Sequence, residues 1–191
     1  DIVQLLAVGW DHSPPYYVME YLTHGSLEER LRAGPLPIVE AVNITKVIAR
    51  ALQKAHGRGI LHCDLKPANV LFDGNGKPRL CDFGQSRLST DQKPSLGTFF
   101  YMAPEQADLL AVPDARWDVY ALGAMLYAML VGSPPYRDGP MQPLLRRATT
   151  LPERLRIYRE FLLCSKPPDV QHHRRGIDQA LAKIVARCLA A

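Results

Sequence analysis

A short polar stretch and the segment that follows it restrict the fold of this chain more than any other part of its sequence. The stretch is His62-Cys63-Asp64-Leu65-Lys66-Pro67-Ala68-Asn69, and Asp82-Phe83-Gly84 begins thirteen residues after Asn69. Between them, residues 70–72 and 78–81 read as two short strands around a turn that contains two glycines. This pattern predicts a β-hairpin, which would bring Asn69 and Asp82 together at its open end.

The side chains of these segments are of the types that phosphoryl transfer requires. Asp64 can accept the proton of an attacking hydroxyl and orient that hydroxyl, and Lys66 can neutralise charge on a transferred phosphoryl group. Magnesium prefers hard oxygen ligands and keeps several waters. The amide oxygen of Asn69 and the carboxylate of Asp82 are therefore a candidate Mg²⁺ site, with ATP oxygens completing the coordination shell.

The same segments resemble the catalytic domain of protein kinases of the Ser/Thr type. Residues 62–69 match the pattern H-R-D-L-x-x-x-N except that Cys63 stands where Arg is expected, residues 82–84 match D-F-G, and Ala103-Pro104-Glu105 matches A-P-E. Weaker matches follow in family order at Val18-Met19-Glu20-Tyr21-Leu22, at Gly97-Thr98 and at the start of the apolar run near Asp118. The similarity covers essentially the whole chain, and its details look most like bacterial members.

The resemblance implies an α+β, protein-kinase-like fold. Residues 1–22 would form the end of the small N-terminal lobe and the hinge, and residues 23–191 would form a mainly helical C-terminal lobe. In this comparison the chain is incomplete at both ends, because the Gly-rich phosphate loop, the strand Lys, its helical Glu partner and the Arg that pairs with Glu105 have no counterpart in it. We therefore expect residues 1–191 alone not to turn over ATP.

The resemblance also implies roles for single residues. Met19 would be the gatekeeper behind the adenine pocket, and the backbone of Glu20 and Leu22 would hydrogen-bond adenine. Leu71 would form the floor under the adenine ring, although plain core packing explains that residue equally well. Thr98 would contact Asp64 and Lys66. A last set would form the hydrophobic column and its anchor that align active kinases: Leu5, His62, Phe83 and Asp118.

The expected activity is transfer of the ATP γ-phosphate to Ser or Thr hydroxyls of protein substrates, with ATP and Mg²⁺ as cofactors. Lys66 is the residue that the Ser/Thr branch of the family carries in this loop. A pseudokinase or scaffold that binds a partner is the alternative, although the joint presence of Asp64, Asn69 and Asp82 argues against lost chemistry. Kinases of small molecules such as aminoglycosides share the phosphate chemistry but usually lack the A-P-E element.

Composition indicates one soluble globular domain, since 47% of the residues are hydrophobic and 22% are charged. The net charge of the chain is +4. Basic residues are in excess in residues 137–175, which contain nine Lys or Arg against four Asp or Glu. Few aromatic residues accompany these charges, so nucleic-acid binding is not supported. A solvated helical surface and a docking patch for an acidic partner remain as alternatives for this segment.

The four cysteines show no zinc or disulfide spacing, which favours the reducing cytoplasm, although the full-length protein could be membrane-anchored outside this chain. Cys63 and Cys81 flank the catalytic motifs and are either packed in the core or redox-sensitive.

The apolar run Val119–Val131 is too short to cross a bilayer and predicts a helix buried on all sides. Other expected elements are strands at 2–10 and 16–21, a helix opened by a capping box at Ser26 and Glu29, a long helix from Pro37 to Gly57, and helices near 106–110, 115–130, 141–148, 152–163 and 177–190.

Overall fold

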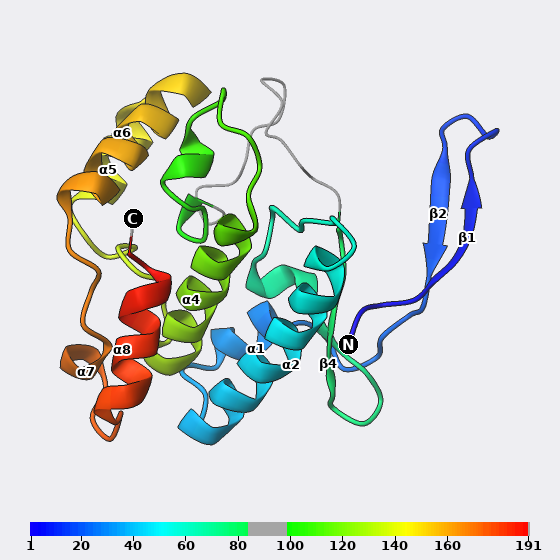
Figure 1. The fold of residues 1–191 in the computed structure, drawn as a ribbon, viewed down its shortest axis with the longest axis horizontal. Coiled ribbons are helices and arrows are strands. Elements are labelled where there is room, and N and C mark those ends of the chain that lie inside the picture. Colours follow the sequence, from blue (N-terminus) through cyan, green and yellow to red (C-terminus); the bar gives the residue numbers. More distant parts are fainter. Residues whose placement is uncertain (84–98, 191) are drawn as a thin grey trace.

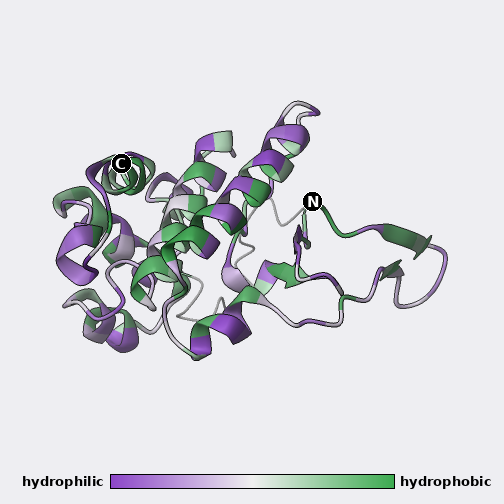
Figure 2. Cartoon of the chain, turned by 90° about the horizontal axis from the view of Figure 1, so that it is seen from below, coloured by the Kyte–Doolittle hydropathy of each residue, from purple (hydrophilic) through white to green (hydrophobic). Residues whose placement is uncertain are grey.

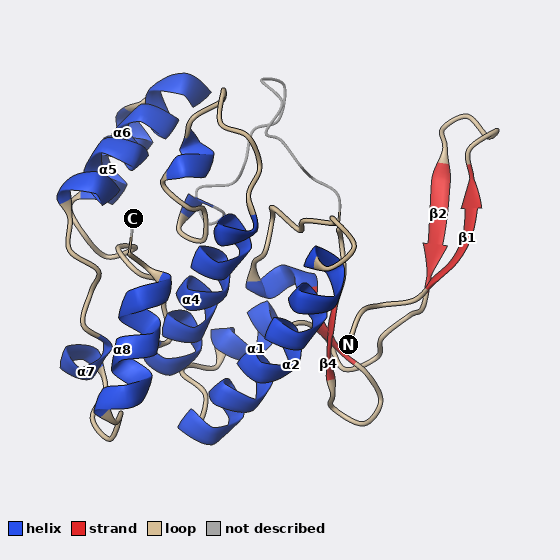
Figure 3. Cartoon of the chain, in the orientation of Figure 1, coloured by secondary structure: helices blue, strands red, loops and turns tan. Residues whose placement is uncertain are grey.

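A computed structural model describes residues 1–83 and 99–190 of the chain as an α+β fold, as the sequence predicts. Figures 1 and 3 show a body of helices from which one β-hairpin projects. The strands are β1 (Leu5–Gly9), β2 (Tyr16–Met19), β3 (Val70–Phe72) and β4 (Pro78–Leu80). The helices are α1 (Leu27–Arg32), α2 (Ile38–His56), α4 (Ala115–Val131), α5 (Met141–Arg147), α6 (Leu151–Cys164), α7 (Val170–His173) and α8 (Gln179–Cys188).

Both predicted hairpins form antiparallel pairs. In the hairpin β3–β4, Val70 pairs with Leu80 and Phe72 pairs with Pro78. The chain start runs beside β4, where the Val3 N–H donates to the Leu80 carbonyl at 2.9 Å and the Leu80 N–H donates to the Asp1 carbonyl at 2.9 Å. The hairpin β1–β2 is the one that extends away from the helices in Figure 1.

Local sequence signals explain where the first two helices begin and end. The Ser26 side chain accepts the Glu29 N–H, and the Glu29 carboxylate accepts the Ser26 N–H, so the predicted capping box is confirmed. Helix α2 starts directly after Pro37 and ends at His56, with Gly57 as its C-cap, in agreement with the helix expected from Pro37 to Gly57. Its buried face consists of Ala41, Ile44, Ile48, Ala51, Leu52 and Ala55.

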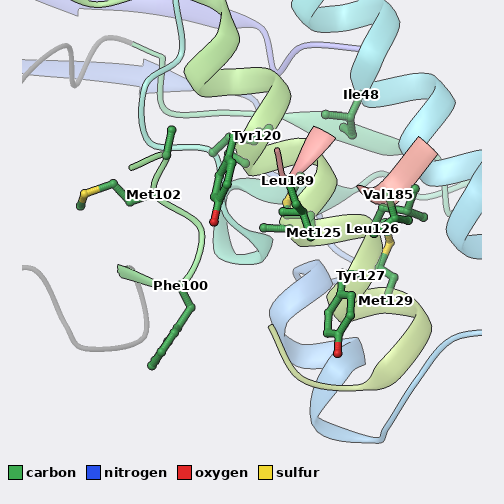
Figure 4. Close-up of a cluster of buried hydrophobic side chains, with 14 of the residues drawn as sticks. Ile48, Phe100, Met102, Tyr120, Met125, Leu126, Tyr127, Met129, Val185 and Leu189 are labelled. Carbon is green, nitrogen blue, oxygen red and sulfur yellow. The ribbon is translucent and has the colours of Figure 1, made fainter. Parts of the chain in front are cut away.

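Helix α4 is the centre of the core, because its apolar residues leave no polar face for solvent. It packs against α2 on one side and α8 on the other. Figure 4 shows side chains of α4 such as Met125 and Met129 beside Ile48 of α2 and Val185 of α8. Figure 2 shows hydrophobic residues on the helices of the body and also on the strands of the projecting hairpin. Within the described residues no helix combines the length and hydropathy that crossing a bilayer requires.

The structure corrects several boundaries. The helix expected near 106–110 is only a 3₁₀ turn at Glu105–Ala107, because the Asp108 N–H bonds back to the Glu105 carbonyl and the chain then turns away. The short helix α7, capped by Asp169, has too few residues to produce a periodic signal and was not expected. The strands expected at 2–10 and 16–21 are shorter in the structure, at Leu5–Gly9 and Tyr16–Met19.

Candidate active site

The buried carboxylate of Asp118, near the start of α4, holds the loop formed by residues 62–69, which we call the catalytic loop. It accepts the backbone N–H of His62 at 2.9 Å and that of Cys63 at 2.8 Å. It also contacts His56 Nε2 at 2.7 Å. Cys63 has a left-handed φ of 62°, a conformation that is costly for a residue with a Cβ atom. The hydrogen bonds that the loop donates to Asp118 therefore stabilise a backbone turn that Cys63 alone would disfavour.

His62 connects the catalytic loop to the end of β4. Its Nε2 donates to the Cys81 carbonyl at 2.9 Å, and its Nδ1 accepts the Asp64 N–H at 3.3 Å. Burial lowers the pKa of His62 from its ordinary value, which matches a neutral ring with one donor and one acceptor nitrogen. The ring lies 4.8 Å from that of Phe83, between centroids. The loop and the segment after β4 thus share one buried junction.

The structure therefore brings together three of the four residues expected in the hydrophobic column and its anchor. The fourth, Leu5, differs from the expectation. It is 57% exposed on β1, and within the described residues it does not join the core. The reason is that β1 pairs only with β2 and projects from the helical body, so no described element covers its outer residues.

Asp64, Lys66 and Asn69 form one hydrogen-bonded group. Lys66 Nζ lies 2.6 Å from Asp64 Oδ2. Asn69 Nδ2 donates to the Asp64 carbonyl at 2.8 Å and approaches Asp64 Oδ2 at 3.4 Å. The side chains of Asp64 and Lys66 remain 15% and 26% exposed, so a carboxylate and an ammonium are held in place yet can be reached from solvent. Such a pair can accept a hydroxyl proton and stabilise negative charge.

The hairpin β3–β4 places Asn69 and Asp82 at its open end, as predicted. The Cys81 N–H donates to the Asn69 carbonyl at 3.0 Å, which fixes the residue before Asp82 beside Asn69. Because Asn69 Nδ2 is bound to Asp64, its Oδ1 is the atom left for a cation. Asp82 is exposed and has a left-handed φ of 58°. An amide oxygen and an exposed carboxylate fit Mg²⁺, which takes few protein oxygens and keeps waters.

Tyr17 of β2 also reaches this end of the hairpin, a contact that the sequence did not indicate. Its hydroxyl donates to Asp82 Oδ1 at 3.3 Å, and the Asp82 charge raises the pKa of the Tyr17 phenol. Gln106 is a second unexpected neighbour, since its Nε2 donates to the Cys63 carbonyl at 2.6 Å. Both contacts join residues more than forty positions apart, so no local sequence pattern predicts them.

Of the residues expected around adenine, Met19 ends β2, Glu20 and Leu22 follow it, and Leu71 lies in β3. Leu22 is buried, Leu71 is half-buried and bridged to Ser26, and Met19 is 39% exposed. The Glu20 N–H already donates to the Gln4 carbonyl at 2.9 Å, so an adenine contact by Glu20 would use its carbonyl oxygen. Thr98, together with Gly84 and Gly97, lies outside the described residues.

Cys63 and Cys81 are buried beside the catalytic motifs. Burial raises the pKa of both thiols to about 11, so neither forms much thiolate near neutral pH. The Cys81 thiol donates to the Asn69 carbonyl at 3.3 Å. These features favour the packing interpretation of the two cysteines over the redox interpretation.

A family model described as Protein kinase domain matches residues 1–191. The chain therefore belongs to the protein kinase domain family. It is 44% identical over 142 residues to the DNA damage-responsive serine/threonine-protein kinase RqkA of Deinococcus radiodurans, covering 69% of this chain and 21% of that protein. It is 34% identical over 184 residues to the serine/threonine-protein kinase PknB of Mycobacterium leprae, covering 92% of this chain and 27% of that protein. The chain thus spans about a quarter of the length of these curated relatives. The predicted resemblance to bacterial Ser/Thr kinases is confirmed.

Proposed function

We propose that the full-length protein transfers the γ-phosphate of ATP to Ser or Thr hydroxyls of protein substrates. The observation that carries the proposal is the group of Asp64, Lys66 and Asn69, hydrogen-bonded to one another beside Asp82 at the open end of the hairpin β3–β4. In this proposal residues 1–22 are the end of the N-terminal lobe with the hinge, and residues 23–191 belong to the C-terminal lobe.

Each residue of the group has a role that its contacts support. Asp64 orients the acceptor hydroxyl and takes its proton. Lys66, 2.6 Å from Asp64, stabilises the negative charge that develops on the transferred group. Asn69 Oδ1 and the Asp82 carboxylate would hold Mg²⁺, which when bound with ATP neutralises phosphate charge and supplies the reactive phosphoryl group. Phosphoryl transfer depends mainly on the positioning of such groups by the protein.

The nucleotide and acceptor contacts extend the proposal. Met19, the Glu20 carbonyl and the backbone of Leu22 would line the adenine site, with Leu71 beneath the ring. Thr98 would contact Asp64 and Lys66 and favour Ser or Thr acceptors. A cytoplasmic location is proposed for this part of the protein, and its support is that Cys63, Cys81, Cys164 and Cys188 are all free thiols.

Radiolabel transfer by the full-length protein tests the proposed roles. Asp82→Ala is expected to abolish Mg²⁺·ATP-dependent transfer, and Asp64→Ala to lower kcat by about 10²-fold or more while nucleotide binding persists. Asp11→Ala is the matched control, because Asp11 is exposed in the turn that joins β1 to β2, outside the catalytic loop and the hairpin β3–β4. Near wild-type transfer by either site variant would show that the roles are assigned wrongly.

A further inference from the structure

A groove of about 660 Å³ opens beside the catalytic loop. Lys66, Pro67 and Ala68 of that loop form one wall, and α1 and α5 contribute others. Phe100, Tyr101, the end of α4 and the segment that follows α4 also line the groove. Because Lys66 Nζ contacts Asp64, the groove begins next to the proposed proton acceptor. A peptide that presents a hydroxyl to Asp64 would therefore lay neighbouring residues in this groove.

The charges that line the groove are mostly positive. The basic side chains are Arg32, Lys66, Arg137 and Arg146, and the one acidic side chain among the described lining residues is Glu28. Two of the basic groups are already paired, because Lys66 contacts Asp64 at 2.6 Å and Arg32 contacts Glu28 at 3.6 Å. The charge of the groove therefore depends on the other two arginines.

Arg137 and Arg146 are both exposed, and neither forms an ion pair with any residue that the structure describes. Arg137 lines the groove together with Tyr101. Burial raises the pKa of the Tyr101 phenol, and the Arg137 charge is near enough to oppose that rise. Arg146 extends from the last turn of α5 into the same lining. A guanidinium presents several donors in a planar fork that matches a carboxylate or a phosphate.

We propose, resting on the Ser/Thr kinase function proposed above, that this groove selects protein substrates with an acidic side chain close to the acceptor hydroxyl. Arg137 and Arg146 bind the carboxylate of that Asp or Glu side chain. Both arginines belong to the basic segment 137–175. The proposal therefore assigns part of that segment to the binding of an acidic substrate.

Peptide kinetics with the phosphatase-treated full-length protein test the proposal. The peptides share one sequence with a single Ser acceptor, and Asp, Ala or Lys is placed in turn at each flanking position. We expect Asp at one or two positions to raise kcat/KM about three- to tenfold over Ala, and Lys to lower it, since each exposed charge pair contributes modestly. The preference should shrink when salt is raised from about 0.05 M to about 0.5 M.

The double variant Arg137→Glu/Arg146→Glu should reverse the preference from Asp to Lys at the same positions. Arg147→Glu is the matched control, because Arg147 is an exposed neighbour on α5 that does not line the groove, and it should keep the Asp preference. If the double variant fails to fold, as judged by its thermal transition, the single variants Arg137→Gln and Arg146→Gln replace it and should each weaken the preference.

The outcomes separate this inference from the function on which it rests. Equal kcat/KM for Asp, Ala and Lys peptides, or an Asp preference that survives the double variant, overturns the inference and leaves the kinase function intact. Absence of transfer to any peptide or protein overturns the proposed function instead. In that case fluorescence anisotropy with labelled Asp, Ala and Lys peptides decides the inference, and equal Kd values overturn it.

Discussion

The carboxylate of Asp118 accepts the backbone N–H of Cys63 at 2.8 Å, although 55 positions separate the two residues. The contact ties the catalytic loop to α4, the most buried helix of the described structure. Asp118 is itself only 1% exposed, and its carboxylate is stabilised by hydrogen bonds from the two backbone N–H groups of the loop and by its contact with the His56 ring. The geometry of Asp64, the next residue along, therefore depends on a side chain that does not face the groove.

Asp118→Ala is expected to lower the free energy of unfolding by about 3–5 kcal/mol, because it leaves buried donors of His62 and Cys63 without an acceptor. Urea unfolding of this chain measures the loss. Asp114→Ala is the control, since the Asp114 carboxylate caps α4 and pairs with Arg116 at an exposed position, and its loss should cost about 1 kcal/mol. An Asp118→Ala loss no larger than that of the control would mean that the loop does not depend on this anchor.

Gly123→Ala tests the close approach of α8 to α4. A Cβ atom at Gly123 would lie 2.4 Å from Cys188 Cβ, which is closer than real atoms approach, so the two helices would have to separate. We expect a loss of about 1–3 kcal/mol in thermal or urea unfolding. Gly74→Ala provides the comparison, because a Cβ at Gly74 meets no atom within 4 Å and should change stability little. Equal stability of the two variants would contradict the packing of these helices.

The features that the sequence predicted well are those with a local signal. The capping box of Ser26 and Glu29 spans four residues, the hairpin around residues 73–76 depends on its glycines, and α4 is apolar on every side. Each is specified by neighbours along the chain, so propensity and periodicity suffice. The grouping of Asn69 with Asp82 followed from that hairpin and needed no further information.

The features that the sequence missed depend on contacts between distant segments. His56 meets Asp118 across 62 positions, and Tyr17 meets Asp82 across 65. Helix periodicity indicates which face of a helix is buried but not which residue it meets, so neither contact could be derived. The exposure of Leu5 was missed for the same reason, because burial of a strand depends on the elements that cover it. The sequence likewise does not show which basic side chains of the groove form ion pairs, because that depends on their neighbours in space.

Alkylation of the cysteines tests whether the core around the catalytic loop is closed to solvent. The thiols of Cys63 and Cys81 have a pKa of about 11, so at pH 8 thiolate is about a thousandth of each, and both are buried. Iodoacetamide at pH 8 should label the exposed Cys164 in the native protein and should label Cys63 and Cys81 only in urea, as read by peptide mass spectrometry. Cys164→Ser should remove the fast native reaction. Native labelling of Cys63 at the rate of Cys164 would favour the redox interpretation.

The substitution of Cys for Arg before Asp64 predicts weak control by phosphorylation. In kinases with Arg at this position, a phosphate on the segment before A-P-E pairs with the Arg and orders that segment. Cys63 is instead 4% exposed within the hydrophobic core, and a neutral thiol cannot form a bidentate pair with phosphate. The candidate acceptors lie outside the described residues: Ser86, Ser89, Thr90 and Ser95.

Replacing those four residues together by Ala should leave kcat/KM of the full-length protein within about tenfold of wild type, a barrier change of about 1.4 kcal/mol. The reason is that the core position of Cys63 provides no positive charge for a phosphate to neutralise. Steady-state transfer to one peptide, with and without phosphatase treatment, measures the effect. A much larger loss that Asp or Glu at one of the four sites restores would show that another basic group performs the role of the missing Arg.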